Sequence, residues 1–144
     1  MKSDVILSIK GLHIHEMMTS DEGIEVITPA KYYQKNEKHY ILYDEVIPET
    51  KEIIGNRLKI EQNRIEFIKG GAKSSKLVFE RDRINISQYQ TPYGAIMVGT
   101  TTKQMDVKEE PDGIDVSILY ALDINDQWAS DCNVNIKVRN MHQE

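Results

Sequence analysis

The residues whose spacing is best suited to chemistry are two histidines near the N-terminus. His13 and His15 form a His-x-His pair, and on a strand both imidazoles would project from one face toward a single metal ion. A metal site needs a third ligand, for which only His39, His142 and carboxylates of unknown position are available. The pair is therefore either part of a metal site or simply solvated. We favour the solvated pair and assign no metal and no other cofactor.

Other signatures of enzyme active sites are missing from the sequence. It contains no Gly-x-Ser-x-Gly nucleophile elbow and no Cys-x-x-Cys pair. Glu25, Glu45 and Glu66 fall on expected strands, but the sequence does not pair them. The single cysteine, Cys132, occupies an apolar strand position, which indicates a buried and unreactive thiol. We assign no catalytic residue, and a protein without enzyme activity is the favoured alternative.

Several polar residues occupy strand positions whose neighbours in the same phase are apolar. They are Thr28, Asn56, Gln88 and Tyr120. Buried polar groups need hydrogen-bond partners, either in the protein, in water or in a ligand. These side chains therefore either line a small pocket, or they tie neighbouring strands together or hold an ordered water. The sequence leaves both alternatives open.

The elements that must position these residues are strands. Apolar residues alternate with polar or small ones over 114–124 and again over 128–138. In the second range the apolar phase holds Trp128, Cys132, Val134, Ile136 and Val138. A period of two places alternate side chains on one face, so both ranges predict half-buried antiparallel strands.

Similar patterns recur along the whole chain between turn signals, and no segment keeps the period of a helix longer than about two turns. The sequence therefore predicts an all-β protein, a single antiparallel, mostly up-and-down β-barrel of about 8–10 strands. The expected strands span 4–15, 24–33, 38–47, 52–61, 64–69, 76–80, 83–90, 92–107, 114–124 and 128–138.

The first expected strand changes phase at Gly11. Apolar residues occupy odd positions from Val5 to Ile9 and even positions at Leu12 and Ile14. A glycine with one inserted residue is typical of a β-bulge, which helps a strand to bend around a barrel. The alternative is that Leu12 and Ile14 cover an outer surface.

The size and net charge of the chain limit the classes of function that it could have. A chain of 144 residues with 40% hydrophobic content fits one domain, 1–144, with its own core. A net charge of −5 and scattered Lys and Arg residues do not favour binding to nucleic acid or to a membrane. The N-terminal region lacks the apolar core of a signal peptide, and no stretch is apolar enough for a membrane helix, so we expect a cytoplasmic protein.

A set of ordered motifs resembles one known family. The motifs begin with Tyr89 and Thr91-Pro92-Tyr93-Gly94, and further elements match in order and spacing: Thr28, Tyr32, Tyr43, Glu45, Leu58-Lys59-Ile60, Phe79, Gly113, Tyr120-x-Leu122, Asn133 and Ile136. Across nearly the whole chain, the sequence resembles the small bacterial YwiB-like proteins of unknown function. The resemblance implies a calycin-like (lipocalin-like) β-barrel and carries over no catalytic residue. The chain departs from the family pattern at Thr28-Pro29-Ala30 and at Arg83.

The favoured function is that of a binding barrel whose lumen or mouth takes a small, partly apolar ligand. Asn56, Gln88 and Tyr120 would be its polar contacts, and Tyr89, Thr91 and Tyr93 would lie near the entrance. The alternative is a structural or interaction barrel with a solid core that acts through its outer surface, as a monomer or a homodimer. An enzyme that uses carboxylates or the histidine pair is the least favoured alternative.

Overall fold

The structure is a computed structural model that describes residues 1–11, 25–46, 50–70, 75–91 and 94–141. In this part of the chain every regular element is a strand, and no helix could span a membrane. The strands are β1 (Asp4–Lys10), β2 (Glu25–Lys35), β3 (Lys38–Val46), β4 (Ile53–Ile60), β5 (Arg64–Lys69), β6 (Ser75–Glu80), β7 (Ile84–Thr91), β8 (Gly94–Glu110), β9 (Gly113–Ile124) and β10 (Gln127–Asn140).

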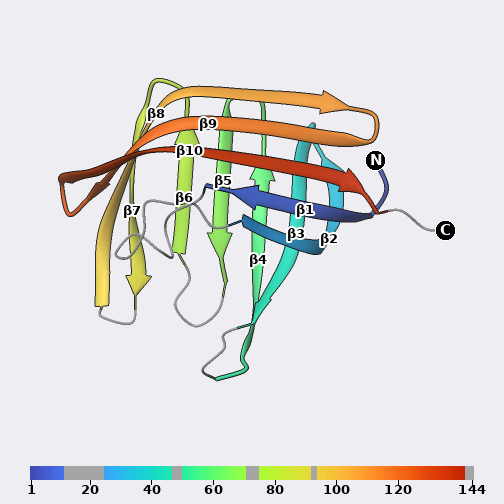
Figure 1. Ribbon diagram of the computed structural model, residues 1–144, viewed down its shortest axis with the longest axis horizontal. Coiled ribbons are helices and arrows are strands. Elements are labelled where there is room, and N and C mark those ends of the chain that lie inside the picture. The colour runs from blue at the N-terminus through green and yellow to red at the C-terminus, as the bar shows by residue number, and fades with distance from the viewer. Residues whose placement is uncertain (12–24, 47–49, 71–74, 92–93, 142–144) are drawn as a thin grey trace.

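The ten strands form one antiparallel sheet in the order β6-β5-β4-β3-β2-β1-β10-β9-β8-β7. Strands that follow one another in the chain are therefore neighbours, except β6 and β7, which are the two ends of the order. Pairing of β1 with β10 joins the two halves of the chain. Figure 1 shows the result: β1, β9 and β10 run across the molecule, while β3 to β6 run behind them at a steep angle. The predicted all-β, up-and-down barrel is confirmed as a nearly closed barrel.

The seam between β6 and β7 is bridged by hydrogen bonds from and to β8. The Thr100 hydroxyl donates to the Val78 carbonyl at 2.6 Å, and the Asp82 amide donates to the Thr102 carbonyl at 2.9 Å. The Arg81 guanidinium also donates to the Met105 carbonyl. The long, curved strand β8 thus bonds to the end of β6. These hydrogen bonds replace the ladder that is missing between β6 and β7.

Inward-facing apolar side chains fill the centre of the barrel. Phe79 of β6 packs edge-on against Tyr120 of β9, with ring centroids 4.7 Å apart. The other core residues come from nearly every strand and alternate with outward-facing ones, as the period of two predicts. They include Val5, Leu7, Ile41, Leu58, Ile65, Met105, Ile118, Leu122, Val134 and Ile136. Cys132 is buried as predicted. This part of the lumen is solid.

Gly11 ends β1 in a backbone conformation that few other residues adopt. Its φ is +91°, and a Cβ atom at this position would collide with the Asn133 carbonyl. Both observations require glycine here. The predicted bulge also involves Leu12 and Ile14, which lie outside the described residues.

The predicted phase is wrong at Trp128, whose side chain is 65% exposed rather than inward. The pairing of β10 with β9 shifts register between Trp128 and Ser130. Such a bulge inserts one residue and moves the side chains before it to the opposite face. Cys132, which follows the bulge, keeps the predicted inward phase.

The predicted phase is also wrong along β7, where Ile84 and Ile86 are 65% and 67% exposed and Gln88 is exposed as well. The partly buried residues are Asn85 and Ser87. The more apolar phase of a strand is normally the inner one, but β7 borders the seam and its inner phase is polar.

Truncating one inward residue of β9 should cost far more stability than truncating its outward neighbour. Ile118 is fully buried, whereas Leu119 is 38% exposed. Ile118→Ala should lower the free energy of unfolding by about 2–5 kcal/mol, and Leu119→Ala should change it by about 0.5 kcal/mol or less. Urea denaturation measures both values, and equal losses would contradict the assigned faces.

Candidate functional site: a slot between β2 and β3

A proline interrupts the pairing of β2 with β3. The Tyr32 amide donates to the Ser3 carbonyl at 2.9 Å, so the even residues of this part of β2 direct their backbone groups toward β1. The odd residues then face β3, and Pro29 is one of them, with no N–H to donate. The β2–β3 ladder begins only at Lys31, which pairs with Leu42.

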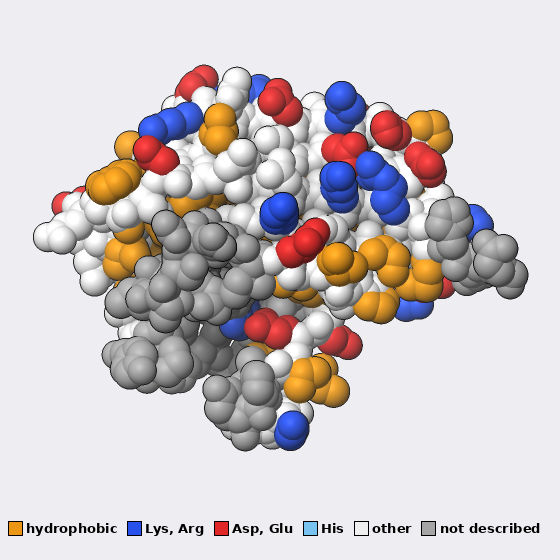
Figure 2. Space-filling view, in the orientation of Figure 1, with side chains coloured by type: hydrophobic (Ala, Val, Ile, Leu, Met, Phe, Trp, Pro, Cys, Tyr) orange, Lys and Arg blue, Asp and Glu red, His pale blue; other side chains and the backbone are white. Residues whose placement is uncertain are grey.

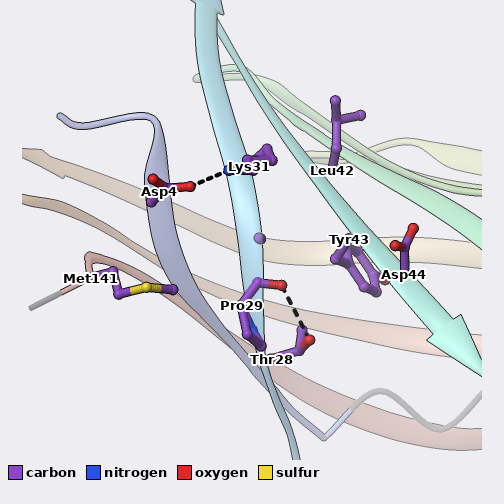
Figure 3. Close-up of a pocket in the computed structure, with 9 residues that line it drawn as sticks. Asp4, Thr28, Pro29, Lys31, Leu42, Tyr43, Asp44 and Met141 are labelled. Atoms are coloured by element: carbon purple, nitrogen blue, oxygen red, sulfur yellow. Dashed lines mark hydrogen bonds and ion pairs between the residues drawn. The ribbon is translucent and has the colours of Figure 1, made fainter.

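The two strands enclose a slot in the barrel wall where this ladder is missing (Figure 3). Its volume is about 550 Å³. Thr28, Ala30 and Tyr43 lie in the inward phase, and the remaining lining residues are Asp4, Pro29, Lys31, Leu42, Asp44 and Met141. The slot therefore has an apolar wall formed largely by Pro29, Leu42 and Met141, and charged side chains at its rim.

Two polar contacts within the slot are already made by the protein. The Lys31 ammonium pairs with the Asp4 carboxylate, which links β2 to β1 at the rim. The Thr28 hydroxyl donates to the carbonyl of Pro29 at 3.2 Å. Both contacts are drawn in Figure 3. They hold the β1–β2 side of the slot in place.

Tyr43 and Asp44 are the polar side chains of β3 that line the slot. Burial, together with the nearby negative charge of Glu45, raises the pKa of the Tyr43 phenol to about 12. The hydroxyl therefore stays protonated at neutral pH, where it can donate one hydrogen bond and accept others.

A polar cluster lies behind Tyr43 at the same end of the barrel. Asn56 pairs with Tyr43 across β3 and β4, and its amide donates to the Glu45 carboxylate at 3.0 Å. The Lys69 ammonium lies 3.7 Å from the same carboxylate, and the Gly70 amide donates to the Asn56 side-chain oxygen at 3.4 Å. These contacts tie β3, β4 and β5 together, which was one of the two alternatives for Asn56.

The structure does not bring the predicted ligand contacts together. Asn56 is buried in the cluster just described, Tyr120 is buried against Phe79 in the core, and Gln88 is exposed on the outer face. Tyr89 and Thr91 belong to β7, but their side chains lie outside the described residues.

Other predicted residues cannot be placed. Tyr93, His13 and His15 are outside the described residues. Within the described ranges, no group of three potential ligands could hold a metal ion. The three glutamates have separate contacts: Glu25 accepts from Ser8, Glu45 from Asn56, and Glu66 from Arg64.

Sequence reasoning missed the slot, although two of its signals are visible in the sequence. Pro29 removes a donor within an expected strand, and Tyr43 has the same phase as the apolar Ile41. By sequence alone, Pro29 is a departure from the family pattern. The effect of Pro29 depends on whether its backbone faces β1 or β3. That can be known only when the pairing of the strands is known.

Sequence reasoning also missed a line of hydrogen bonds across the opposite end of the barrel. His39 on β3 is buried between Tyr32 and Glu109, with Nδ1 2.6 Å from the Tyr32 hydroxyl and Nε2 2.6 Å from the carboxylate. The Gln62 amide donates to the other Glu109 oxygen at 2.5 Å. An ionised carboxylate only accepts, so Nε2 donates to Glu109, and Nδ1 shares the second hydrogen bond with the Tyr32 hydroxyl.

Both ring nitrogens of His39 are hydrogen-bonded within the protein. The line of hydrogen bonds therefore connects strands, and His39 has no free nitrogen that could act as a general base. Hydrogen bonds from His39 and Gln62 hold the pKa of Glu109 below its ordinary value. Burial, with the negative charge of Glu109, raises the pKa of the Tyr32 phenol. The line joins β2 and β3 to the end of β8, which the sheet order places far from them.

Comparison with known proteins gives a consistent assignment. The family described as "Domain of unknown function (DUF1934)" matches residues 7–136. The chain belongs to the DUF1934 family. A relative, described as "Uncharacterized beta-barrel protein YwiB" from Bacillus subtilis (strain 168), is 28% identical over 123 residues, which cover 81% of this chain and 82% of the relative.

A solved structure of the same fold extends this assignment. The crystal structure of ywiB protein from Bacillus subtilis matches with a TM-score of 0.76 at 20% identity, and the match covers 97% of this chain and 93% of that one. The resemblance to YwiB-like proteins is thereby confirmed. DUF1934 proteins have no activity in their description, so function must be argued from the site itself.

The Glu109 contacts predict an acid-dependent loss of stability. A carboxylate whose pKa is lowered by folding stabilises the folded state above its unfolded-state pKa, and this contribution disappears as the pH falls through the folded-state pKa. Glu109→Gln should therefore lower stability at neutral pH, and its difference from wild type should shrink below pH 4.5, the ordinary pKa of this group.

Urea denaturation at a series of pH values measures this difference. Glu110→Gln is the matched control, because Glu110 is the exposed neighbour on the same strand, and it should have little effect. A Glu109→Gln difference that stayed constant down to about pH 3 would contradict the assigned role of the carboxylate.

Proposed function

We propose that this DUF1934 protein binds a small, partly apolar ligand in the slot between β2 and β3. The observation that carries the proposal is a 550 Å³ slot with an apolar wall and the Tyr43 phenol facing into it. Small-molecule sites are typically concave, about 300–1,000 Å³ in volume, and mostly apolar with a few directed polar groups.

The packing of the core favours a ligand site in the wall over one in the centre of the barrel. The lumen around Tyr120 is filled by side chains, so a ligand there would have to displace well-packed residues. The slot instead exists because Pro29 cannot extend a ladder. A ligand in the slot would bind between β2 and β3 without displacing any core residue.

The lining residues suggest separate roles in binding. Pro29, Leu42 and Met141 would cover the apolar part of the ligand, and burial of that part would supply most of the affinity. The Tyr43 hydroxyl would make the directional hydrogen bond. The rim charges of Asp4, Lys31 and Asp44 would remain in contact with water and with the polar end of the ligand.

Native mass spectrometry of the purified protein tests for a bound small molecule, and a thermal-shift screen of small amphipathic compounds supplies probes for titration. Removing the hydroxyl in Tyr43→Phe should weaken binding of such a probe about 2- to 10-fold, the usual net value of one hydrogen bond. Isothermal titration calorimetry measures the affinity.

Tyr33→Phe is the matched control, because Tyr33 is an exposed residue outside the slot that stacks on Tyr40 at 4.8 Å. It should leave the affinity unchanged. Equal effects of both variants, or the absence of any bound or stabilising compound, would overturn the proposal.

A further inference from the structure

Next to the slot, β2 and β3 each have one strand edge that pairs with no strand of the described chain. β2 extends back to Glu25 while it pairs with β1 on its other side, and β3 extends to Val46 while it pairs with β4. The pairing of β2 with β3, however, stops at Lys31 and Leu42. Figure 3 shows the two strands diverging from this point. Two facing, unpaired strand edges therefore border the slot.

The backbone of β3 offers the slot both donors and acceptors. Leu42 is opposite Lys31, whose backbone groups face β3, so Leu42 directs its own groups toward β2. Directions alternate along a strand, so the N–H and C=O groups of Asp44 and Val46 also face the slot. β2 is the poorer edge, because Pro29 lies in the phase that faces β3 and has no N–H. A further strand in the slot would therefore pair with β3.

Exposed apolar side chains flank both edges where the ladder is missing. On the outer face, Ile27 of β2 and Val46 of β3 are 65% and 55% exposed. On the inner face, Val26 pairs in register with the buried Ile9 of β1 and is nevertheless 40% exposed. Figure 2 shows hydrophobic side chains gathered at the lower right of the molecule, where Figure 1 places β2 and β3. A ligand that extends along β3 would cover apolar groups on both faces.

We propose that the ligand of the slot is an extended peptide segment with alternating apolar side chains, which adds a strand to the barrel wall at the β3 edge. This inference rests on the proposed function and names the class of its ligand. Backbone hydrogen bonds with Asp44 and Val46 would hold the segment, as in other proteins that bind a peptide at a sheet edge. Its alternate side chains would contact Tyr43 inside the wall and Ile27 outside it.

The charges that line the slot disfavour an acidic peptide. Lys31 pairs with Asp4, so these two charges cancel, whereas Asp44 forms no ion pair with any described residue. Arg57 on β4 pairs with Leu42, one row from Asp44, and does not line the slot. We therefore expect a peptide with one Lys to bind about 2- to 5-fold more tightly at low salt than the same peptide with Glu, the usual value of an exposed ion pair.

Isothermal titration calorimetry tests the proposal with acetylated hexapeptides in which Val, Leu or Phe alternates with Thr and one Lys. At least one of them should bind with a dissociation constant below about 1 mM. Alternate amides of a strand point to opposite sides, so N-methylation of the set that faces β3 should weaken binding about tenfold, the value of one to two hydrogen bonds. N-methylation of the other set is the matched control and should have a much smaller effect.

Asp44→Pro tests the same hydrogen bonds from the protein side. Proline removes the Asp44 N–H, which faces the slot, and it leaves the β3–β4 ladder intact, because that ladder uses the odd residues of β3. Asp44→Asn also removes the charge but keeps the N–H. A hexapeptide should therefore bind Asp44→Pro about fivefold more weakly than Asp44→Asn, and circular dichroism confirms that both variants are folded.

Equal effects of the two N-methylated sets, or equal affinities of the two Asp44 variants, would overturn the peptide assignment. The same holds if no hexapeptide binds wild type while a small amphipathic compound does, a result that leaves the proposed function in place. If neither class of compound binds wild type, both proposals fail.

Discussion

The apolar face shared by the strands is the constraint on which the rest of the structure depends. One residue in two must face the same interior, and the sheet must curve far enough to close around it. In the part of the chain that the structure describes, β6 and β7 do not pair, and Thr100 and Arg81 supply hydrogen bonds in place of a ladder there. Bulges near Lys103 and Trp128 let the long strands β8 and β10 bend while keeping the core residues inside.

This constraint also decides where the barrel has open space. Because side chains such as Phe79 and Tyr120 fill the interior, the available space lies in the wall, where two strands stop pairing. One proline is sufficient for this, because its missing amide is directed at the neighbouring strand. The partly buried Tyr43 phenol is one of the polar groups that line the slot.

The polar groups at the two ends of the barrel have different consequences. At the end that carries the slot, Glu45, Asn56 and Lys69 satisfy one another and support Tyr43 from behind. At the opposite end, the line through His39 and Glu109 connects strands that are not neighbours in the sheet. The slot therefore adjoins a polar cluster that links three strands, and a separate line of hydrogen bonds links strands at the far end.

The sequence by itself determined the all-β class, most strand positions and the burial of Asn56, Tyr120 and Cys132, because a period of two is a local property of a strand. Only the tertiary structure decided the faces of β7 and Trp128. Those faces depend on an irregular register and on the open seam, which the alternation of residue types does not encode. The slot and the His39 line likewise join residues distant in sequence, and their contacts exist only after the sheet has curved into a barrel.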